Sequence, residues 1–322
     1  MSPLSRRRLL IGASALAAGS TGLVAAKVLR QPPTRVAVLA VPAYTPGLTD
    51  TLTRGLREFP ELLARARGVR VVLKPNLVEY SPERPINTNP ALIGALAEAF
   101  LHIGAAEVVV AEGAGHRRDV EALVEMSGLA EVLSDLRLQF VDLNADRTRT
   151  TTFPHDFTGF GRLELAATAA GAPLLVPVAK MKTHHWAGVT LTMKNLFGTV
   201  PGAVYGWPKN PLHWAGIHES IADLWTALRP GFAVIDGVEA MEGDGPIMGS
   251  AVPMGCVLMG ESCPAVDATA ARLMGVVPER IRYLDHASWH GGTVAASRIS
   301  VIGDAVAPRD FRVHEHLRSI KG

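Results

Sequence analysis

The stretch that decides the fold reads Pro173-Leu-Leu-Val-Pro-Val-Ala-Lys180-Met-Lys-Thr-His-His-Trp-Ala-Gly-Val-Thr-Leu-Thr-Met-Lys-Asn-Leu-Phe-Gly-Thr-Val-Pro-Gly202. Residues 173–179 form an apolar run of the kind that makes a buried strand. The fifteen residues from Lys180 onward contain three lysines and two histidines. Open α/β sheets bind ligands where a strand ends in a loop. The stretch therefore predicts such a sheet, with a ligand site that begins at Lys180.

Composition alone leaves two interpretations of residues 180–202 open, a solvated basic loop and a binding site. Lysine and histidine often serve as nucleophiles, proton carriers or metal ligands near neutral pH. Ala187, Gly188, Gly198 and Gly202 carry little or no side chain, which lets the backbone approach a ligand closely. These small residues favour the binding site.

The rest of the chain alternates apolar, β-branched runs with helical patterns. The expected strands are residues 35–41, 69–73, 107–111, 138–143, 174–178, 232–235, 256–259 and 298–302. The expected helices are residues 49–67, 90–103, 119–127, 216–228 and 264–274. Strands separated by helices predict an α/β fold with a mainly parallel sheet that helices cover on both faces.

One segment, residues 147–169, breaks this alternation. It is rich in threonine and then alternates polar with apolar residues, which favours a β-hairpin. A chain of this length can form one large domain or two lobes. We expect an N-terminal α/β lobe over residues 34–175 and a C-terminal α/β lobe over residues 176–322, with a cleft between them.

The first thirty residues predict export. Ser5-Arg6-Arg7-Arg8-Leu9-Leu10 matches a twin-arginine signal, and residues 9–26 are weakly apolar and rich in Gly, Ala and Ser. Val24-Ala25-Ala26 suits cleavage by signal peptidase. We expect residues 1–30 to engage the twin-arginine translocase and to direct the protein to the periplasm or another extracytoplasmic location. Membrane contact is expected only if this segment stays uncleaved as an anchor.

The composition excludes several classes of protein. The formal net charge is +2, and removing residues 1–26 takes away three arginines and no acid, which leaves −1. A charge so close to zero predicts no nucleic-acid binding. Cys256 and Cys263 are the only cysteines, and two thiolates cannot supply the four that an iron–sulfur cluster needs. The two cysteines fit either a disulfide or a pair of buried thiols.

Two further expected strands end in polar residues. Lys74-Pro75-Asn76 follows one strand, and Glu112-Gly-Ala-Gly-His116-Arg117 follows the next. The second segment resembles a dinucleotide fingerprint that Arg118 interrupts. The amides of Gly113 and Gly115 are therefore better interpreted as an anion cradle.

A third strand leads into an acidic segment, Asp236-Gly-Val-Glu-Ala-Met-Glu-Gly-Asp244-Gly-Pro246. It contains four carboxylates within nine residues. Oxygen-rich loops bind hard cations, and solvated acids in a turn are the alternative. We expect Asp236, Glu239 and Asp244 to be metal ligands.

Several of these motifs occur together in one known family. They are Lys74-Pro75-Asn76, Lys180-Met-Lys182-Thr-His184, Lys194-Asn195-Leu-Phe-Gly198, Asp236-Gly237, Gly243-Asp-Gly-Pro246 and Ala265-Val-Asp267-Ala. In this the chain resembles the domain-of-unknown-function 362 family over nearly its whole length after the export segment. The family name brings no established reaction. Many members carry ferredoxin-like cysteine motifs that this chain lacks, so the resemblance implies no autonomous electron-transfer role.

A second, more distant resemblance concerns the order of a lysine and three histidines. His116-Arg117, His184, Lys194, Pro201-Gly202 and His213 follow one another along the chain. Their order is similar to that in the nickel-dependent lactate racemase family, where the lysine anchors a nickel pincer nucleotide. One histidine of that family ligates nickel and two exchange the substrate proton. The resemblance implies Lys194 as the anchor, His213 as the ligand, and His116 with His184 as the acid/base pair.

The chain departs from that family in two places. Leu191 and Thr192 replace a glycine pair, and an arginine-bearing motif is reduced to Thr88-Asn89-Pro90. The resemblance therefore implies a shared pocket more than a shared cofactor. On chemistry alone, two histidines can move protons without a metal, whereas three converging histidines can hold nickel, zinc or iron.

The expected function is that of an exported enzyme that moves protons on a small anionic molecule, as a racemase or isomerase does, with help from a metal or cofactor. The expected catalytic residues are His116, His184 and Lys194. The expected substrate-binding residues are Lys74, Asn76, Lys180, Lys182 and Asn195. The expected metal ligands are His213, Asp236, Glu239 and Asp244, and the expected cofactor contacts are Lys194, Gly113 and Gly115. A non-catalytic periplasmic protein that binds a metal or ligand in the same cleft is the alternative.

Overall fold

The computed structural model describes residues 32–115, 119–207 and 209–322. Within it, Thr34–Gly322 forms one compact unit. The predicted export segment at residues 1–30 and the predicted catalytic residue His116 lie outside the described residues. A search of the described helices finds none with the length and apolar character needed to span a bilayer.

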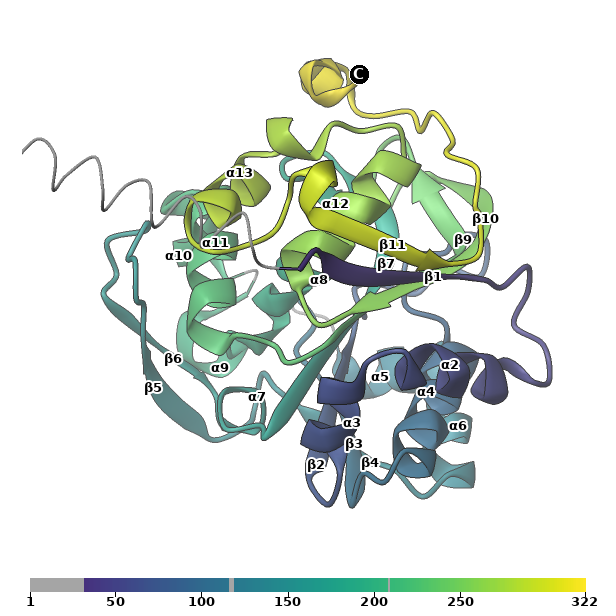
Figure 1. Ribbon diagram of the computed structural model, residues 1–322. Coiled ribbons are helices and arrows are strands. Elements are labelled where there is room, and N and C mark those ends of the chain that lie inside the picture. The colour runs from purple at the N-terminus through teal and green to yellow at the C-terminus, as the bar shows by residue number, and fades with distance from the viewer. Residues whose placement is uncertain (1–31, 116–118, 208) are drawn as a thin grey trace, which may run out of the picture. The chain divides into compact units, whose positions relative to one another are not determined.

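A mainly parallel sheet organises the described part of the chain (Figure 1). The strands are β1 Thr34–Ala40, β2 Arg70–Pro75, β3 Glu107–Glu112, β4 Gln139–Asp142, β5 Thr148–Thr152, β6 Arg162–Ala166, β7 Leu174–His184, β8 Gly188–Thr190, β9 Ala233–Glu242, β10 Ser250–Gly260 and β11 Ile299–Gly303. Nine of them form one sheet in the order β11-β1-β10-β9-β7-β2-β3-β4, with β8 paired to β7. Only β10 and β8 run antiparallel to their neighbours in this sheet.

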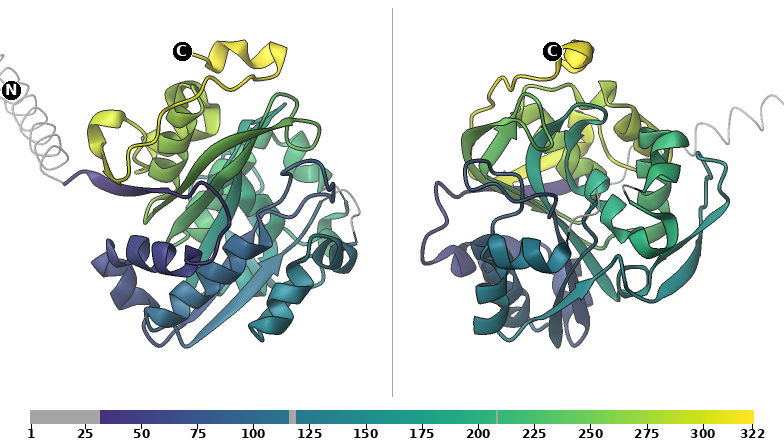
Figure 2. Two further views of the ribbon diagram at one scale, coloured as in Figure 1. Left: turned by 90° about the vertical axis from the view of Figure 1, so that its right-hand side faces the viewer. Right: turned by 180° about the vertical axis from the view of Figure 1, so that it is seen from behind.

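Helices cover both faces of the sheet. They are α2 Leu48–Arg57, α3 Pro60–Ala66, α4 Pro90–His102, α5 Val120–Met126, α6 Leu129–Asp135, α7 Ala167–Ala170, α8 Thr192–Asn195, α9 Gly202–Tyr205, α10 Asn210–Trp214, α11 Ile217–Leu228, α12 Cys263–Leu273 and α13 Arg282–Trp289. Helices α2–α6 lie together on one side, and α11–α13 lie on the other (Figures 1 and 2). The hairpin of β5 and β6 packs on the same core as α11–α13.

Alternate residues of each central strand serve opposite cores. In β2, Val71 and Leu73 pack with α2–α4, while Val72 packs with the core on the other face. All three side chains are fully buried. A strand covered on both faces needs apolar residues at every position in the core. This explains the apolar runs at residues 71–73 of β2 and 174–179 of β7.

The predicted α/β class is confirmed, including the mainly parallel sheet and its cover on both faces. The predicted hairpin in residues 147–169 is present as β5 and β6. The single helix predicted over residues 49–67 is wrong, because it divides into α2 and α3. Pro60 opens α3, where the missing N–H of proline costs nothing, whereas the same residue inside a longer helix would remove a hydrogen bond.

The predicted end of the central strand at Val178 is also wrong. Strand β7 continues through the basic residues to His184, and every side chain in it is buried. Apolar periodicity could not show this extension, because only Met181 of the last five residues of β7 packs in the apolar core. The other four bond to polar groups: Lys180, Lys182, Thr183 and His184.

The predicted boundary between residues 175 and 176 lies inside β7. This strand pairs with β2 from the predicted N-terminal lobe and with β9 from the predicted C-terminal lobe. The two halves of the chain therefore share one sheet, and a ligand site formed by both halves would lie along the edge of that sheet.

Candidate functional site

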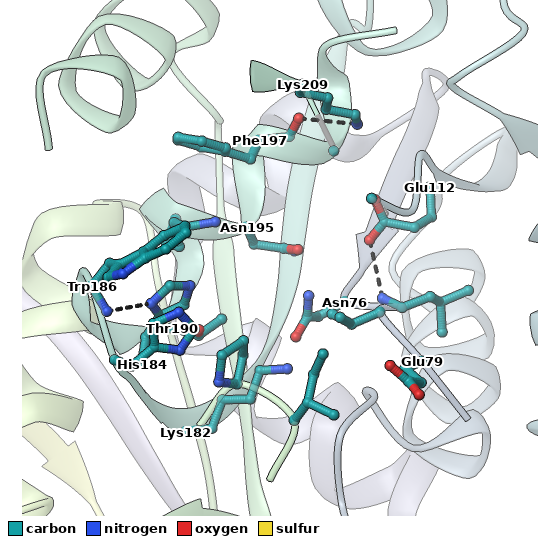
Figure 3. Close-up of a pocket in the computed structure, with 18 of the residues that line it drawn as sticks. Asn76, Glu79, Glu112, Lys182, His184, Trp186, Thr190, Asn195, Phe197 and Lys209 are labelled. Carbon is teal, nitrogen blue, oxygen red and sulfur yellow. Dashed lines mark hydrogen bonds between the residues drawn. The ribbon is translucent and has the colours of Figure 1, made fainter. Parts of the chain in front are cut away.

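A cavity of about 520 Å³ opens at the carboxyl ends of β2, β3 and β7. This is the edge at which open α/β sheets bind ligands. Lysines, imidazoles, amides and a hydroxyl make up most of its polar lining: Lys74, Asn76, Lys182, His184, His185, Thr190, Lys194, Asn195, Lys209 and His213. Figure 3 shows Asn76, Asn195 and Lys182 reaching toward the open space between His184 and Glu112.

The hairpin of β7 and β8 supplies one side of the cavity. Gly188 opens β8 and has a φ of +83°, a left-handed conformation that favours glycine. The register pairs Lys182 with Thr190 and His184 with Gly188. The long strand β7 thus carries its lysine and histidine to the cavity, and the hairpin sets Thr190 beside them.

Lys74 and Glu112 form a buried ion pair that joins β2 to β3. The Nζ atom of Lys74 lies 2.7 Å from Oε1 of Glu112 and donates to Oδ1 of Asn195 at 3.1 Å. The amide of Asn195 donates back to the Lys74 carbonyl at 2.8 Å. Burial lowers the pKa of Lys74, and the Glu112 carboxylate opposes that shift. The predicted substrate contacts Lys74 and Asn195 therefore also hold three elements of the fold together.

Lys182 is fully buried and, among the described residues, has no carboxylate partner. Its ammonium donates to the carbonyl of Ile86 at 2.7 Å. Burial, followed by the charges of Lys194 and Lys180, lowers the pKa of Lys182 well below its usual value. A cation in this position costs folding free energy unless an anion joins it.

His184 is held in one tautomer by the backbone. Its Nδ1 atom accepts hydrogen bonds from the N–H groups of Trp186 at 3.0 Å and Ala187 at 3.2 Å. A nitrogen that accepts these bonds carries no proton, so the neutral ring keeps its proton on Nε2. Burial, followed by the charge of Lys194, lowers the pKa of His184 well below its usual value. His184 therefore presents a neutral N–H donor, which refines the predicted acid/base role.

Asp267 fixes the short helix that carries Lys194 and Asn195. From α12, its carboxylate accepts hydrogen bonds from the N–H of Thr192 at 2.8 Å, the hydroxyl of Thr192 at 2.5 Å and the N–H of Met193 at 3.0 Å. These donors are the first groups of α8, which have no partner within the helix. Asp267 is therefore a positioning residue for the site.

Lys194 itself is partly buried in the cavity wall. Its Nζ atom lies 4.0 Å from the centre of the Phe197 ring, a cation–π contact. Burial, followed by the charge of Lys74, lowers the pKa of Lys194 to about 8. An amine with that pKa is present in both protonation states near neutral pH.

Lys209 is a fourth cavity lysine, which no sequence motif indicated. Its ammonium donates to the Gly113 carbonyl at 2.8 Å and to the Phe197 carbonyl at 3.4 Å. Its backbone has a φ of +67°, which is uncommon for a residue other than glycine and occurs often at functional sites. Burial lowers the pKa of Lys209 to about 7.

The predicted anion cradle at Gly113 and Gly115 needs correction. Both residues line the cavity, but the N–H of Gly113 already donates to Oε1 of Glu112 at 2.7 Å. A Cβ atom at Gly113 would lie 2.4 Å from the Gly198 carbonyl oxygen. Glycine is needed at position 113 because two backbone segments meet there, not because its amide must face a ligand.

Two buried polar atoms in the cavity have no protein partner among the described residues. They are Oδ1 of Asn76 and Oγ1 of Thr190. Both residues line the cavity and are less than one tenth exposed. Buried polar atoms are rarely left unpaired in proteins, so these two atoms indicate where a ligand contributes hydrogen bonds.

Lys180 and Asp236 form a second buried ion pair away from the cavity lining, which corrects their predicted role. The Lys180 ammonium lies 3.0 Å from Oδ2 of Asp236. Asp236 also accepts from the hydroxyl of Tyr44 at 2.7 Å and from the N–H of Asn89 at 3.0 Å. With these partners Asp236 is a structural carboxylate, and it joins β9 to β7 and to the start of α4.

The four predicted metal ligands do not all meet at one place. Glu239 is exposed, whereas Asp244 and His213 line the cavity. Within residues 32–115, 119–207 and 209–322, no group of three or more His, Cys, Asp or Glu is arranged to hold a metal ion. Cys256 and Cys263 are both free and buried.

Comparison with known proteins identifies the family. The family described as Domain of unknown function (DUF362) matches residues 71–272. The chain belongs to this family. The family resemblance predicted from the sequence motifs is thus confirmed, and the matched region contains β2, β3, β7 and α8, which carry most of the cavity residues.

A thylakoid-associated protein of Synechocystis sp. is similar to this member of the family. The two chains are 29% identical over 224 residues, which is 66% of this chain and 65% of that protein. This chain thus matches about two thirds of its relative's length.

Two solved structures show weaker likeness. The lactate racemase apoprotein of Thermoanaerobacterium thermosaccharolyticum is 15% identical, with a TM-score of 0.48, and the match covers 76% of this chain and 57% of that one. A protein of Thermotoga maritima is 13% identical, with a TM-score of 0.37, over 64% of this chain and 53% of that one. Likeness at this level carries no argument about activity.

Sequence motifs therefore found part of the site and missed part. The structure brings Lys74, Asn76, Lys182, His184, Lys194, Asn195 and His213 to one cavity, as predicted. It adds Glu112 as the partner of Lys74, the hydroxyl of Thr190 and the lysine at position 209. The scarcity of lysine could have indicated Lys209. The chain has only seven lysines against twenty-five arginines, so each lysine outside the motifs was also a candidate.

Proposed function

We propose that the protein binds a small carboxylate-bearing molecule in this cavity and moves a proton on it. The observation that carries the proposal is the placement of the lysines. Four of the chain's seven lysines line the cavity, and no arginine of the described residues does. Most positively charged side chains elsewhere in the chain are arginines, so the cavity lysines are not part of a general basic surface.

Chemistry explains why lysine suits such a cavity. An arginine keeps its charge in any protein environment, whereas a buried lysine can lose its proton and can act as a base or nucleophile. The pKa of Lys194 is lowered to about 8 and that of Lys209 to about 7. The cavity can therefore hold an anion with its protonated lysines and accept a proton with another.

The geometry supports separate roles for the polar groups. Lys182 and the Nε2–H of His184 can hold a carboxylate, or an oxygen that becomes negative during the reaction, because both are donors in a buried setting. Lys194 is the base that takes the substrate proton, since its pKa lies close to neutral pH. Asn76 and Thr190 can bind a hydroxyl or carbonyl of the substrate, because each has an unpaired polar atom.

Exchange of substrate hydrogen with solvent tests this proposal without knowledge of the product. In D2O, we expect the protein to exchange the hydrogen on the carbon next to the carboxylate of at least one member of a panel of 2-hydroxy carboxylates, measured by proton NMR. Lys194→Ala should slow this exchange by about 100-fold or more, the usual contribution of general-base catalysis. Lys321→Ala is the matched control, because Lys321 lies outside the cavity and should leave the rate unchanged.

The outcome also separates an enzyme from a binding protein that uses the same cavity. A binding protein would show no exchange with any carboxylate. Its Lys194→Ala variant would only lose affinity, by roughly 1.5–3 kcal/mol for a hydrogen bond to a charged group.

We also propose that the protein is exported by the twin-arginine route. The support is the sequence around Arg6 and Arg7, which lies outside the described residues. Replacing both arginines with lysine should leave the precursor in the cytoplasm, because the translocase recognises the guanidinium pair. Cell fractionation and immunoblotting measure this, and normal export of the double variant would refute the assignment.

A further inference from the structure

One wall of the cavity is a continuous row of five rings. His184 and His185 stack with their centroids 4.9 Å apart, and His185 lies 4.7 Å from Trp186. Trp186 lies 5.6 Å from His213, which in turn lies 5.7 Å from Phe197. All five side chains line the cavity. Rings at these separations are in contact. Trp186 meets His185 and His213 at interplanar angles of 70° and 68°, so the wall is a continuous aromatic surface made of several ring faces and not of one plane.

The rim of the cavity exposes apolar side chains to water. Trp186 is 55% exposed and Met248 is 59% exposed, and both belong to the lining. Leu77, Val78 and Ile247 line the cavity as well. Exposed apolar patches bordered by polar groups commonly mark binding sites. In this cavity the charged groups and the apolar groups lie within one space.

The cavity is also larger than a carboxylate group requires. Its volume of about 520 Å³ lies within the range of roughly 300–1,000 Å³ that is typical of sites for drug-sized ligands. A two- or three-carbon acid would fill only the part next to the lysines. The aromatic wall would then remain in contact with water, where its apolar area contributes nothing to binding.

We propose that the ligand of this cavity is a carboxylate attached to a flat aromatic or conjugated body. The carboxylate lies at Lys182 and the Nε2–H of His184, and the flat body lies against the wall that Trp186 and its neighbours form. This inference rests on the proposed function for the position of the anion. It adds the chemical class of the rest of the molecule.

Four probes separate the contributions of charge, apolar area and flatness. They are 2-naphthoate, its saturated analogue decahydro-2-naphthoate, acetate and the uncharged 2-naphthylmethanol, each measured by calorimetry or by displacement. We expect 2-naphthoate to bind at least about 30-fold more tightly than acetate, because it buries an apolar ring system. We expect it to bind about three- to tenfold more tightly than the saturated analogue, because only flat rings stack on the wall. The alcohol should bind about tenfold more weakly than 2-naphthoate, because it lacks the charge.

Variants of two exposed tryptophans locate the binding. Trp186→Ala should weaken 2-naphthoate binding about tenfold and change acetate binding less than twofold, and Trp186→Phe should restore most of the loss. Trp289→Ala is the matched control, because Trp289 is 79% exposed and lies outside the cavity lining. It should change neither affinity. Circular dichroism confirms that each variant is folded.

The possible outcomes distinguish this inference from the proposed function. If neither acetate nor 2-naphthoate binds, the anion site itself is refuted. If acetate binds but 2-naphthoate binds no more tightly, or if Trp186→Ala leaves its affinity unchanged, the anion site stands and the aromatic ligand class is wrong. Equal affinity for 2-naphthoate and its saturated analogue would overturn the requirement for a flat body.

Discussion

Lys182→Met should make the protein more stable and remove its affinity for anions. Lys182 is fully buried with only a carbonyl partner, and its pKa lies well below that of a lysine in the unfolded chain. Below pH 10, the unfolded lysine binds a proton more tightly than the folded one, so Lys182 lowers the free energy of unfolding. Methionine has a similar length and no charge. We expect a gain of roughly 1–3 kcal/mol, the scale found when buried charged groups are replaced by apolar ones.

Urea unfolding at pH 7 measures the stability, and calorimetric titration with sulfate measures anion binding. We expect the sulfate affinity of the variant to fall about 100-fold, because a buried charge-assisted contact is lost. Lys321→Met is the control for sulfate binding, because Lys321 lies outside the cavity. A destabilised Lys182→Met variant that still binds sulfate would show that Lys182 has a structural role instead.

Lys74→Met should have the opposite effect on stability. The same substitution in the same cavity removes the partner of Glu112, which lies 2.7 Å from the Lys74 ammonium and is buried. An unpaired carboxylate inside a protein is costly, and breaking a buried pair in this way typically lowers stability by about 3–5 kcal/mol. We expect a loss of that size in urea unfolding at pH 7.

A second variant shows whether the lost charge pair is the cause. Lys74→Met combined with Glu112→Gln leaves neither charge of this pair, and the one amide oxygen of glutamine can still accept from the N–H of Leu77 or of Gly113, whereas Glu112 accepts from both. The double variant should recover most of the stability. If it is as unstable as Lys74→Met, the effect comes from lost packing and not from the unpaired charge.

We expect Lys74→Met to lower the free energy of unfolding and Lys182→Met to raise it. Sequence analysis could not distinguish these two roles. Both residues follow apolar runs near the end of a strand, and both belong to motifs of the family. Their difference depends on Glu112, which is thirty-eight residues from Lys74 in sequence and comes from the neighbouring strand. Partners supplied by another strand cannot be seen in a local pattern.

The fold was more predictable than the site because apolar periodicity reports which residues face a core. The strands that become β1, β2, β3 and β4 were predicted within two residues of their observed bounds. The predictions for β7, β9 and β10 were too short, because each of these strands continues beyond its apolar run. No helix was predicted at α8, which is only four residues long and is held by Asp267 from another helix.

The acidic segment at residues 236–244 shows that closeness in sequence does not predict a shared metal site. Its four carboxylates are close in sequence, but Asp236 is buried with Lys180 and Tyr44, while Glu239 is exposed. Neighbouring residues of a strand point to opposite faces, so residues that are close in sequence did not form one site.

The central claim is that the cavity lysines bind an anion, and proton uptake on binding tests it most directly. In the free protein the pKa of Lys194 is about 8 and that of Lys209 is about 7. A bound anion favours the protonated amines and raises both pKa values. At pH 8 binding should therefore take up protons from solution, and affinity should fall as the pH rises from 7 to 9.

Calorimetric titration with sulfate, whose charge is constant in this range, measures the uptake when it is repeated at pH 8 in two buffers with different ionisation enthalpies. We predict an uptake of about 0.5–1.5 protons per sulfate at pH 8. The contribution of Lys194 and Lys209 should vanish at pH 5.5, where both are already protonated, so that any uptake left there comes from Lys182 and His184, whose pKa values lie well below their usual ranges. Sulfate binding with no proton uptake at pH 8, and with the same affinity from pH 6 to pH 9, would contradict the account.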